Sequence, residues 1–315
     1  MSRRPLVLYA ICALAFGTMA FLAKLASARL SGSEVALLRF VAMLAPLLLV
    51  PSIARQARRF DRLDLLLIRG VCGGIAVLLF FLAIAHIPVG IATLLNYSSP
   101  IWSVLFAALF LGEPVDRRLV VPFVASFAGM LLVVESRARP GDLLGFGRWE
   151  LVGFLSAILS GAAVAAIRAA RRSESSWSIY ASFSIFGFVT SAPFGVASWR
   201  TPNGREWLLV AGVGATSIAA QLLMTYSYRW VTNMEAGVLA QLAVVTAMLL
   251  GAIFLGDRLT WSGGVGALLA IGGVVGVAWI QSGGGRAGPV PRDPPRGPEP
   301  RESRDAPLEG TFRSR

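Results

Sequence analysis

Apolar residues of this chain fall into ten long runs that are separated by short polar stretches. A run of about 20 apolar residues is long enough to cross a hydrocarbon core of roughly 30 Å. Inside lipid a helix satisfies its own backbone hydrogen bonds, whereas the edge of an open sheet cannot. The pattern therefore predicts an all-α polytopic membrane protein with ten transmembrane helices. The runs are 6–26, 34–51, 65–85, 89–111, 119–134, 150–168, 178–199, 207–228, 235–255 and 262–280.

The fourth run is interrupted near its middle by a cluster of polar residues and a proline. Pro100 removes one backbone N–H and frees the carbonyl four residues earlier, that of Asn96. Tyr97, Ser98 and Ser99 lie beside them. So much polarity inside a membrane span is either functional or satisfied by neighbouring helices. The pattern favours a substrate-facing cluster, with a proline kink packed against other helices as the alternative.

The end of this run is repeated later in the chain. The sequence FLGE at 110–113 returns as FLGD at 254–257, an offset of 144 positions. The same offset pairs Gly17 with Gly161, Lys24 with Arg168, Leu95 with Leu239, Ala108 with Ala252, Gly129 with Gly273 and Val133 with Val277. Because no gap is needed, we predict a duplicated unit, with one repeat in 1–137 and the other in 138–280. Five spans is an odd number, so the second repeat has to enter the membrane from the opposite side as an inverted repeat.

Composition supports a membrane protein and adds a positive charge. The chain is 56% hydrophobic and carries a net charge of +12. Its basic residues are scattered over short loops, which is typical of anchoring to anionic lipid and not of a nucleic-acid partner. With the N-terminus inside, the inner loops and N-terminus carry more basic residues than the outer loops (12 against 8), which favours both termini in the cytoplasm. Residues 281–315 are rich in Pro and Arg with no apolar face and predict a disordered cytoplasmic tail.

Together these features resemble a known family. The ten spans, the five-plus-five duplication, the LLRF segment at 37–40, Pro100 and the two FLG(E/D) endings are similar to those of EamA-type transporters of the drug/metabolite transporter superfamily. The resemblance covers about residues 6–280. It implies a multi-pass carrier of the bacterial inner (plasma) membrane, often an exporter of amino acids or other small metabolites. It also implies a central cavity between the two halves, with Gly112 and Glu113, and later Gly256 and Asp257, as structural residues at helix ends.

The two repeats differ where the fourth span is broken. Pro100 corresponds to Val244, and Asn96 and Tyr97 correspond to Ala240 and Gln241. A ligand site between the repeats therefore need not be symmetric.

Seven polar or aromatic residues within the runs are candidates for binding a substrate. A glutamine can instead bridge two helices, and a tryptophan can serve in packing alone. The candidates are Asn96, Tyr97, Ser99, Trp102, Gln221, Gln241 and Arg39.

Arginine and lysine within the runs have an alternative to ligand binding. Arg39 lies about one and a half turns into its helix, where a charge at mid-bilayer costs about 2.5–3.5 kcal/mol. Its long stem could instead reach outward to the membrane surface. Lys24 and Arg69 lie nearer helix ends, where this outward extension is expected.

The absence of acidic residues from the middle of every run bears on the substrate. A carrier of organic cations usually buries a carboxylate, whereas the charge within these spans is positive. We therefore expect a neutral, zwitterionic or anionic metabolite that moves by alternating access.

Few residues of this chain suit enzymatic chemistry. One histidine, two separated cysteines and no nucleotide-binding loop predict no metal, no cofactor and no enzymatic activity. A membrane-embedded enzyme, or a lipid-handling or structural membrane protein, remains the alternative. The small residues of 262–280 could also support a homodimer.

Overall fold

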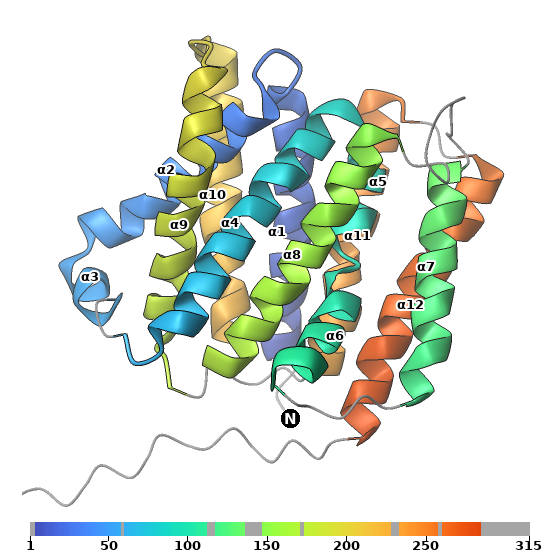
Figure 1. The fold of residues 1–315 in the computed structure, drawn as a ribbon. Helices are drawn as coiled ribbons and strands as arrows, with labels where there is room; N and C mark the ends of the chain where they lie inside the picture. Colours follow the sequence, from blue (N-terminus) through green and yellow to red (C-terminus); the bar gives the residue numbers. More distant parts are fainter. Residues whose placement is uncertain are drawn as a thin grey trace, which may run out of the picture.

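The computed structural model describes residues 4–57, 60–111, 117–135, 147–170, 173–227, 233–257 and 260–284, and every regular element within these ranges is a helix. Figure 1 shows the long helices running along one another in one bundle, with α7 and α12 together at one edge. The helices are α1 (Arg4–Ala26), α2 (Gly32–Leu49), α3 (Pro51–Ala57), α4 (Leu63–His86), α5 (Val89–Asn96), α6 (Ser99–Leu111), α7 (Val120–Glu135), α8 (Arg148–Ala170), α9 (Ser176–Ala197), α10 (Gly204–Ser227), α11 (Asn233–Leu255) and α12 (Trp261–Gly284), with a 3₁₀ turn at Arg117–Leu119.

Apart from the short α3, the described helices follow the apolar runs, and the fourth run contains both α5 and α6. Seven segments are long and apolar enough to cross a membrane, and three shorter apolar helices account for the remaining runs. The prediction of an all-helical polytopic membrane protein is therefore confirmed. Residues 281–284, predicted to belong to a disordered tail, are instead the end of α12. Gly112 and Glu113, and the rest of the predicted tail from 285 onward, lie outside the described residues.

The interrupted fourth run consists of two helices rather than one kinked helix. The N–H of Tyr97 still reaches the carbonyl of Thr93 at 2.9 Å, and that of Ser98 turns back to Leu95 at 3.2 Å. Pro100 then occupies the first turn of α6, where its missing N–H would have no partner in the helix anyway. In the second repeat α11 is continuous through Val244, so the interruption belongs to the first repeat alone.

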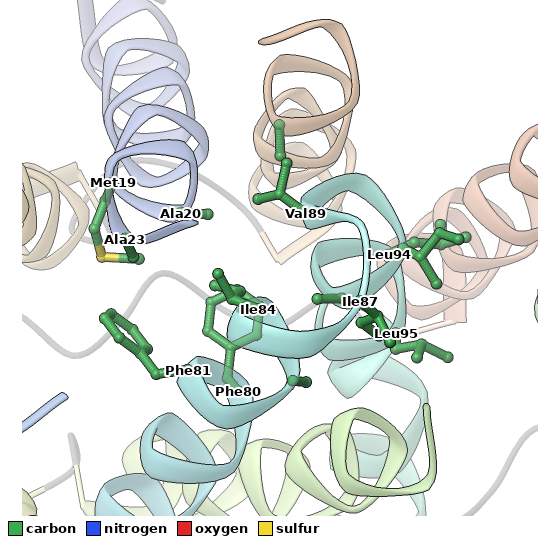
Figure 2. Packing of buried hydrophobic residues seen from close by; sticks show 14 of the residues in the cluster. Met19, Ala20, Ala23, Phe80, Phe81, Ile84, Ile87, Val89, Leu94 and Leu95 are labelled. Atoms are coloured by element: carbon green, nitrogen blue, oxygen red, sulfur yellow. The ribbon is translucent and has the colours of Figure 1, made fainter. Parts of the chain in front are cut away.

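The largest buried cluster lies where helices of the first repeat meet. Residues of α1, α4 and α5 gather in it, including Met19, Phe81, Ile84 and Leu95 (Figure 2). Valines of α10 and α11 complete it from the second repeat, among them Val213 and Val244 with no exposed surface. The two repeats therefore share one core.

Close backbone contact between α7 and α12 joins equivalent parts of the two repeats. A side chain at Gly129 would lie 2.5 Å from the carbonyl oxygen of Gly266, and one at Gly273 would lie 2.5 Å from that of Pro122. Gly129 and Gly273 are equivalent residues, and so are Pro122 and Gly266. The two contacts thus exchange partners between repeats, as a twofold relation requires. Gly266, Gly273 and Gly276 of α12 lie in this contact within the chain, whereas a side chain at Gly272 would meet nothing within 4 Å.

The packing of whole helices and the capping of helix ends in one repeat also have equivalents in the other repeat. Packing of α4 along α8 has its counterpart in α10 along α1. Ser31 caps α2 by accepting the N–H of Glu34 at 3.1 Å, and Ser175 caps α9 by accepting that of Ser178 at 3.0 Å. Both caps have the extended backbone that an N-cap residue adopts.

Candidate substrate-binding site

The break between α5 and α6 is bonded to the second repeat. The amide nitrogen of Asn96 donates to Ser156 Oγ at 2.6 Å and to Ser160 Oγ at 3.2 Å. The two serines are one turn apart on α8 and therefore share one face. The polar group at the end of α5 thus connects the two repeats inside an apolar bundle.

Trp102 lies against the same helix, one turn into α6. Its ring makes edge contacts with Phe154 at 5.4 Å and with Phe123 at 6.3 Å between centroids. Gly161 of α8 permits this approach, because a side chain there would meet the Trp102 Cβ. The buried indole nitrogen has no hydrogen-bond partner among the described residues. Ser99 is half-buried at the start of α6.

Arg39 points into the protein rather than toward the membrane surface. Its side chain is 2% exposed, and Nε donates to Ser217 Oγ of α10 at 2.9 Å. The guanidinium carbon lies 5.0–5.8 Å from the centroids of three phenylalanine rings. Nη1 is buried without a hydrogen-bond partner in the described part of the chain. The alternative of outward extension is therefore wrong for Arg39. The rings are those of Phe40, Phe81 and Phe183.

Arg69 also turns inward, against the prediction from its position near a helix end. It is 5% exposed, and its guanidinium carbon lies 3.9 Å from the centroid of Phe183. Gly73, one turn later on α4, leaves the space that Arg69 Nη1 occupies. A stacking partner on α9 and the absence of a side chain at 73 together make the inward position available.

Lys24 is held at the end of α4. Its Nζ donates to the carbonyls of Ile87 at 2.9 Å and Ala85 at 3.4 Å. Carbonyls at the C-terminus of a helix carry partial negative charge, which suits an ammonium group. Lys24 thus binds backbone within the protein, which differs from the outward extension that we expected.

Tyr97 connects the helix break to Arg39. Tyr97 and Tyr180 both lie within electrostatic range of the Arg39 guanidinium. Tyr180 in turn donates to the carbonyl of Met43 on α2 at 2.8 Å. The first repeat therefore presents Arg39 and Tyr97 toward one region.

The two glutamines lie on helices that flank α1. Gln221 of α10 and Gln241 of α11 are both 5% exposed. Cys12 on α1 donates through Sγ to the carbonyl of Ala220 at 3.2 Å, and Tyr9 packs against Ala240. Asn96 and Trp102 thus contact α8, Arg39 contacts α9 and α10, and the two glutamines lie on helices that pack against α1.

Sequence reasoning missed the partners of these residues. Ser156 and Ser160 are four positions apart, a spacing that marks one helix face. Phe183 lies 144 positions after Arg39, so the duplication already relates the two. The duplication does not relate Ser217 to Arg39, because the counterpart of Ser217 in the first repeat is Gly73.

Both ends of the bundle are bridged between the repeats. At one end Arg29 forms a two-bond pair with Glu206, from Nε to Oε1 at 2.6 Å and from Nη2 to Oε2 at 2.7 Å. The hydrogen bond with Glu206 raises the pKa of Arg29. At the other end the Glu174 carboxylate accepts the backbone N–H groups of Asp61 at 2.7 Å and Arg62 at 2.5 Å. Polar contacts therefore join the two repeats at both ends of the bundle.

Metal-ligating residues do not gather in the described part of the chain. No group of three or more His, Cys, Asp or Glu side chains lies together there, and Cys12 and Cys72 are both free.

Comparison with known proteins places this arrangement in a family. The profile of the EamA-like transporter family matches residues 4–135 and 147–279, once for each repeat. The chain belongs to the EamA-like transporter family. The duplication inferred from the offset is thereby confirmed, and so is the resemblance to the drug/metabolite transporter superfamily.

Curated relatives of the EamA protein are transporters. It is 28% identical over 263 residues to a pseudopaline exporter of Pseudomonas aeruginosa, covering 82% of this chain and 91% of that protein. It is 35% identical over 91 residues to a probable terminal-alkyne amino-acid exporter of Streptantibioticus cattleyicolor, covering 29% and 30% of the two chains. A human protein, solute carrier family 35 member G1, is 24% identical over 237 residues, covering 69% and 63%.

A solved crystal structure shares the fold. It superposes with a TM-score of 0.60 at 20% sequence identity and covers 89% of this chain and 98% of that one.

Proposed function

We propose that this EamA protein exports amino acids or other small polar metabolites across the bacterial inner membrane by alternating access. The observation that carries this proposal is the bond from Asn96 to Ser156 and Ser160, a polar connection between repeats inside an apolar bundle. Polar groups in that position are expected at a substrate path. Two of the relatives are named as exporters, one of pseudopaline and one of a terminal-alkyne amino acid, which supports the direction of transport.

The proposed architecture is ten transmembrane helices in two inverted five-helix repeats, 1–137 and 138–280, with both termini in the cytoplasm. The exchange of equivalent contacts between α7 and α12 supports it. So does the excess of basic residues on the side that carries the N-terminus. The segment that follows α12, from 285 onward, would then be cytoplasmic.

The proposed transport cycle opens the two bridged ends in turn. Opening one end requires the Arg29–Glu206 pair to separate, and opening the other requires Glu174 to release the backbone at 61 and 62. The substrate would meet the seven candidates predicted above. These are Asn96, Tyr97, Ser99, Trp102, Gln221, Gln241 and Arg39.

A metabolite comparison tests the proposal. In cells that express the chain, the concentration of the exported metabolite should be lower inside the cells and higher in the medium than in cells without it. Asn96→Leu should abolish the difference at equal membrane abundance, because leucine cannot bond Ser156. Deletion of 285–315 serves as the control and should leave it intact. Identical metabolite profiles with and without the intact chain would contradict export.

A further inference from the structure

We propose that Arg39 and Arg69 form an anion-binding site at the junction of the two repeats and that the exported metabolite binds there through a carboxylate or a similar oxyanion. This inference rests on the proposed export function and narrows its substrate class. Both guanidinium groups are turned into the protein, from α2 and α4, and both lie beside the ring of Phe183 on α9.

The carboxylates buried in the described part of the chain are engaged elsewhere. Glu206 pairs with Arg29, and Glu174 accepts backbone N–H groups at the far end of the bundle. Glu34 accepts the backbone N–H of Arg200 at 3.2 Å. A buried charge is costly unless it is paired and hydrogen-bonded. Within the described residues Arg39 forms no ion pair with a carboxylate and contacts the Ser217 hydroxyl and three phenylalanine rings, so an incoming anion would add the charge partner that it lacks there.

Donor geometry at Arg39 suits an oxyanion. Its guanidinium carries five N–H donors in a planar fork. One of them, at Nε, is used by Ser217, and Nη1 has no partner in the described residues. The phenylalanine rings attract the cation through their faces but accept none of these donors as an oxygen would. A carboxylate could take the unused donors in the two-bond arrangement that arginine favours.

The position of the two arginines between the repeats is compatible with alternating access. Arg39 and Phe183 are equivalent residues of the two repeats, so their contact lies where the repeats meet. A site at such a junction is reachable from either side as the repeats move. In this structure Arg39 and Arg69 are 2% and 5% exposed, and the Arg29–Glu206 pair and the Glu174 contacts bridge the repeats at the two ends of the bundle.

Thermal unfolding of the purified full chain in detergent tests the site. The probes are succinate, L-glutamate and inorganic phosphate, compared with succinamide at constant ionic strength. At about ten times the Kd, a bound anion should raise the unfolding temperature by about 2–4 °C. Arg39→Gln and Arg69→Gln should each remove this rise, while Arg55→Gln on the exposed face of α3 should keep it. No rise with any anion, or an equal rise in both variants, would overturn the proposal.

Two further measurements separate this site from folding and from export. Arg39→Lys keeps the charge but loses the fork, so it should fold and bind each anion at least tenfold more weakly. The metabolite comparison is then repeated with Arg69→Gln. If the intact chain exports only solutes without an oxyanion, the anion site falls while export stands. If the anions bind but no metabolite is exported, the site stands and the export proposal falls.

Discussion

Ser126 donates a hydrogen bond of 3.1 Å to the backbone carbonyl of Ala270, which lies 144 positions later in the chain. That separation is the offset of the duplication, so Ser126 is bonded to its own counterpart. Arg39 and Phe183 meet in the same way between α2 and α9. Equivalent residues can contact each other only near a twofold relation between the repeats. Substitutions in the α7–α12 and α2–α9 contacts are therefore expected to have the largest effect on the packing of the two repeats.

Gly273→Ala should destabilise the protein by about 1–3 kcal/mol, the usual cost of overpacking. The new methyl group would lie 2.5 Å from the Pro122 carbonyl oxygen and from the backbone nitrogen of Ser126, so the helices must separate. Gly272→Ala is the matched control, because a side chain there meets nothing within 4 Å. Thermal unfolding in detergent should show a lower midpoint for the first variant only. Equal midpoints would contradict the close approach of α7 and α12.

Gly256→Ala should cost about 1–2 kcal/mol for a different reason, backbone strain. Gly256 has a φ of 67°, a left-handed conformation that places a Cβ too close to the following carbonyl. The turn also brings the N–H of Asp257 to the carbonyl of Gly251 at 3.2 Å, which closes α11. Gly204→Ala, where φ is not positive and no atom lies nearby, should change the unfolding midpoint little. A midpoint for Gly256→Ala that equals the control would show that the turn adapts without strain.

Ser156→Ala should weaken the connection between α5 and α8 by about 0.6–1.7 kcal/mol, as measured for hydrogen bonds between membrane helices. Ser160→Ala should cost less, because its bond to Asn96 is longer, at 3.2 Å against 2.6 Å. Unfolding of the single and double variants, combined with Asn96→Ala, gives the coupling energy directly. Zero coupling between Asn96 and Ser156 would show that the bond contributes nothing to stability.

Arg29→Gln should open the end of the bundle that this residue closes. A cysteine at Ser33, which is 5% exposed and bonded to Ser198 at 2.9 Å at the same end, serves as a reporter after Cys12 and Cys72 are replaced by alanine. We expect faster labelling of this cysteine by a membrane-impermeant thiol reagent, because the pair with Glu206 crosses between the repeats.

The control for this variant is Arg62→Gln. Arg62 pairs with Asp64, two residues away, at the end of the bundle opposite to Arg29. Loss of the Arg62 charge should therefore not speed the labelling of the cysteine at position 33. High ionic strength should also speed labelling in the unchanged chain, since Arg29 is half-exposed and its pair is screened by salt. Labelling rates that respond equally to both substitutions would argue against the Arg29–Glu206 pair as a closing contact.

Much of the architecture could be predicted from the chain itself. The spans follow from the length of the apolar runs, since lipid leaves helices as the way to satisfy the backbone. The duplication follows from an offset without gaps, and the break near Pro100 follows from the chemistry of proline. These features depend on local sequence or on its repetition, so no knowledge of distant contacts is needed.

Side-chain direction was decided by tertiary structure alone. From its position near a helix end, Arg69 was expected to reach the membrane surface, yet it stacks on Phe183 because Gly73 leaves room and α9 supplies the ring. Asn96 was recognised as polar within a span, but its partners on α8 lie 60 and 64 positions away. A helical pattern states which residues share a face and not what that face meets. Which polar groups bind each other depends on how helices from distant parts of the chain pack, and that is determined only when both repeats are folded together.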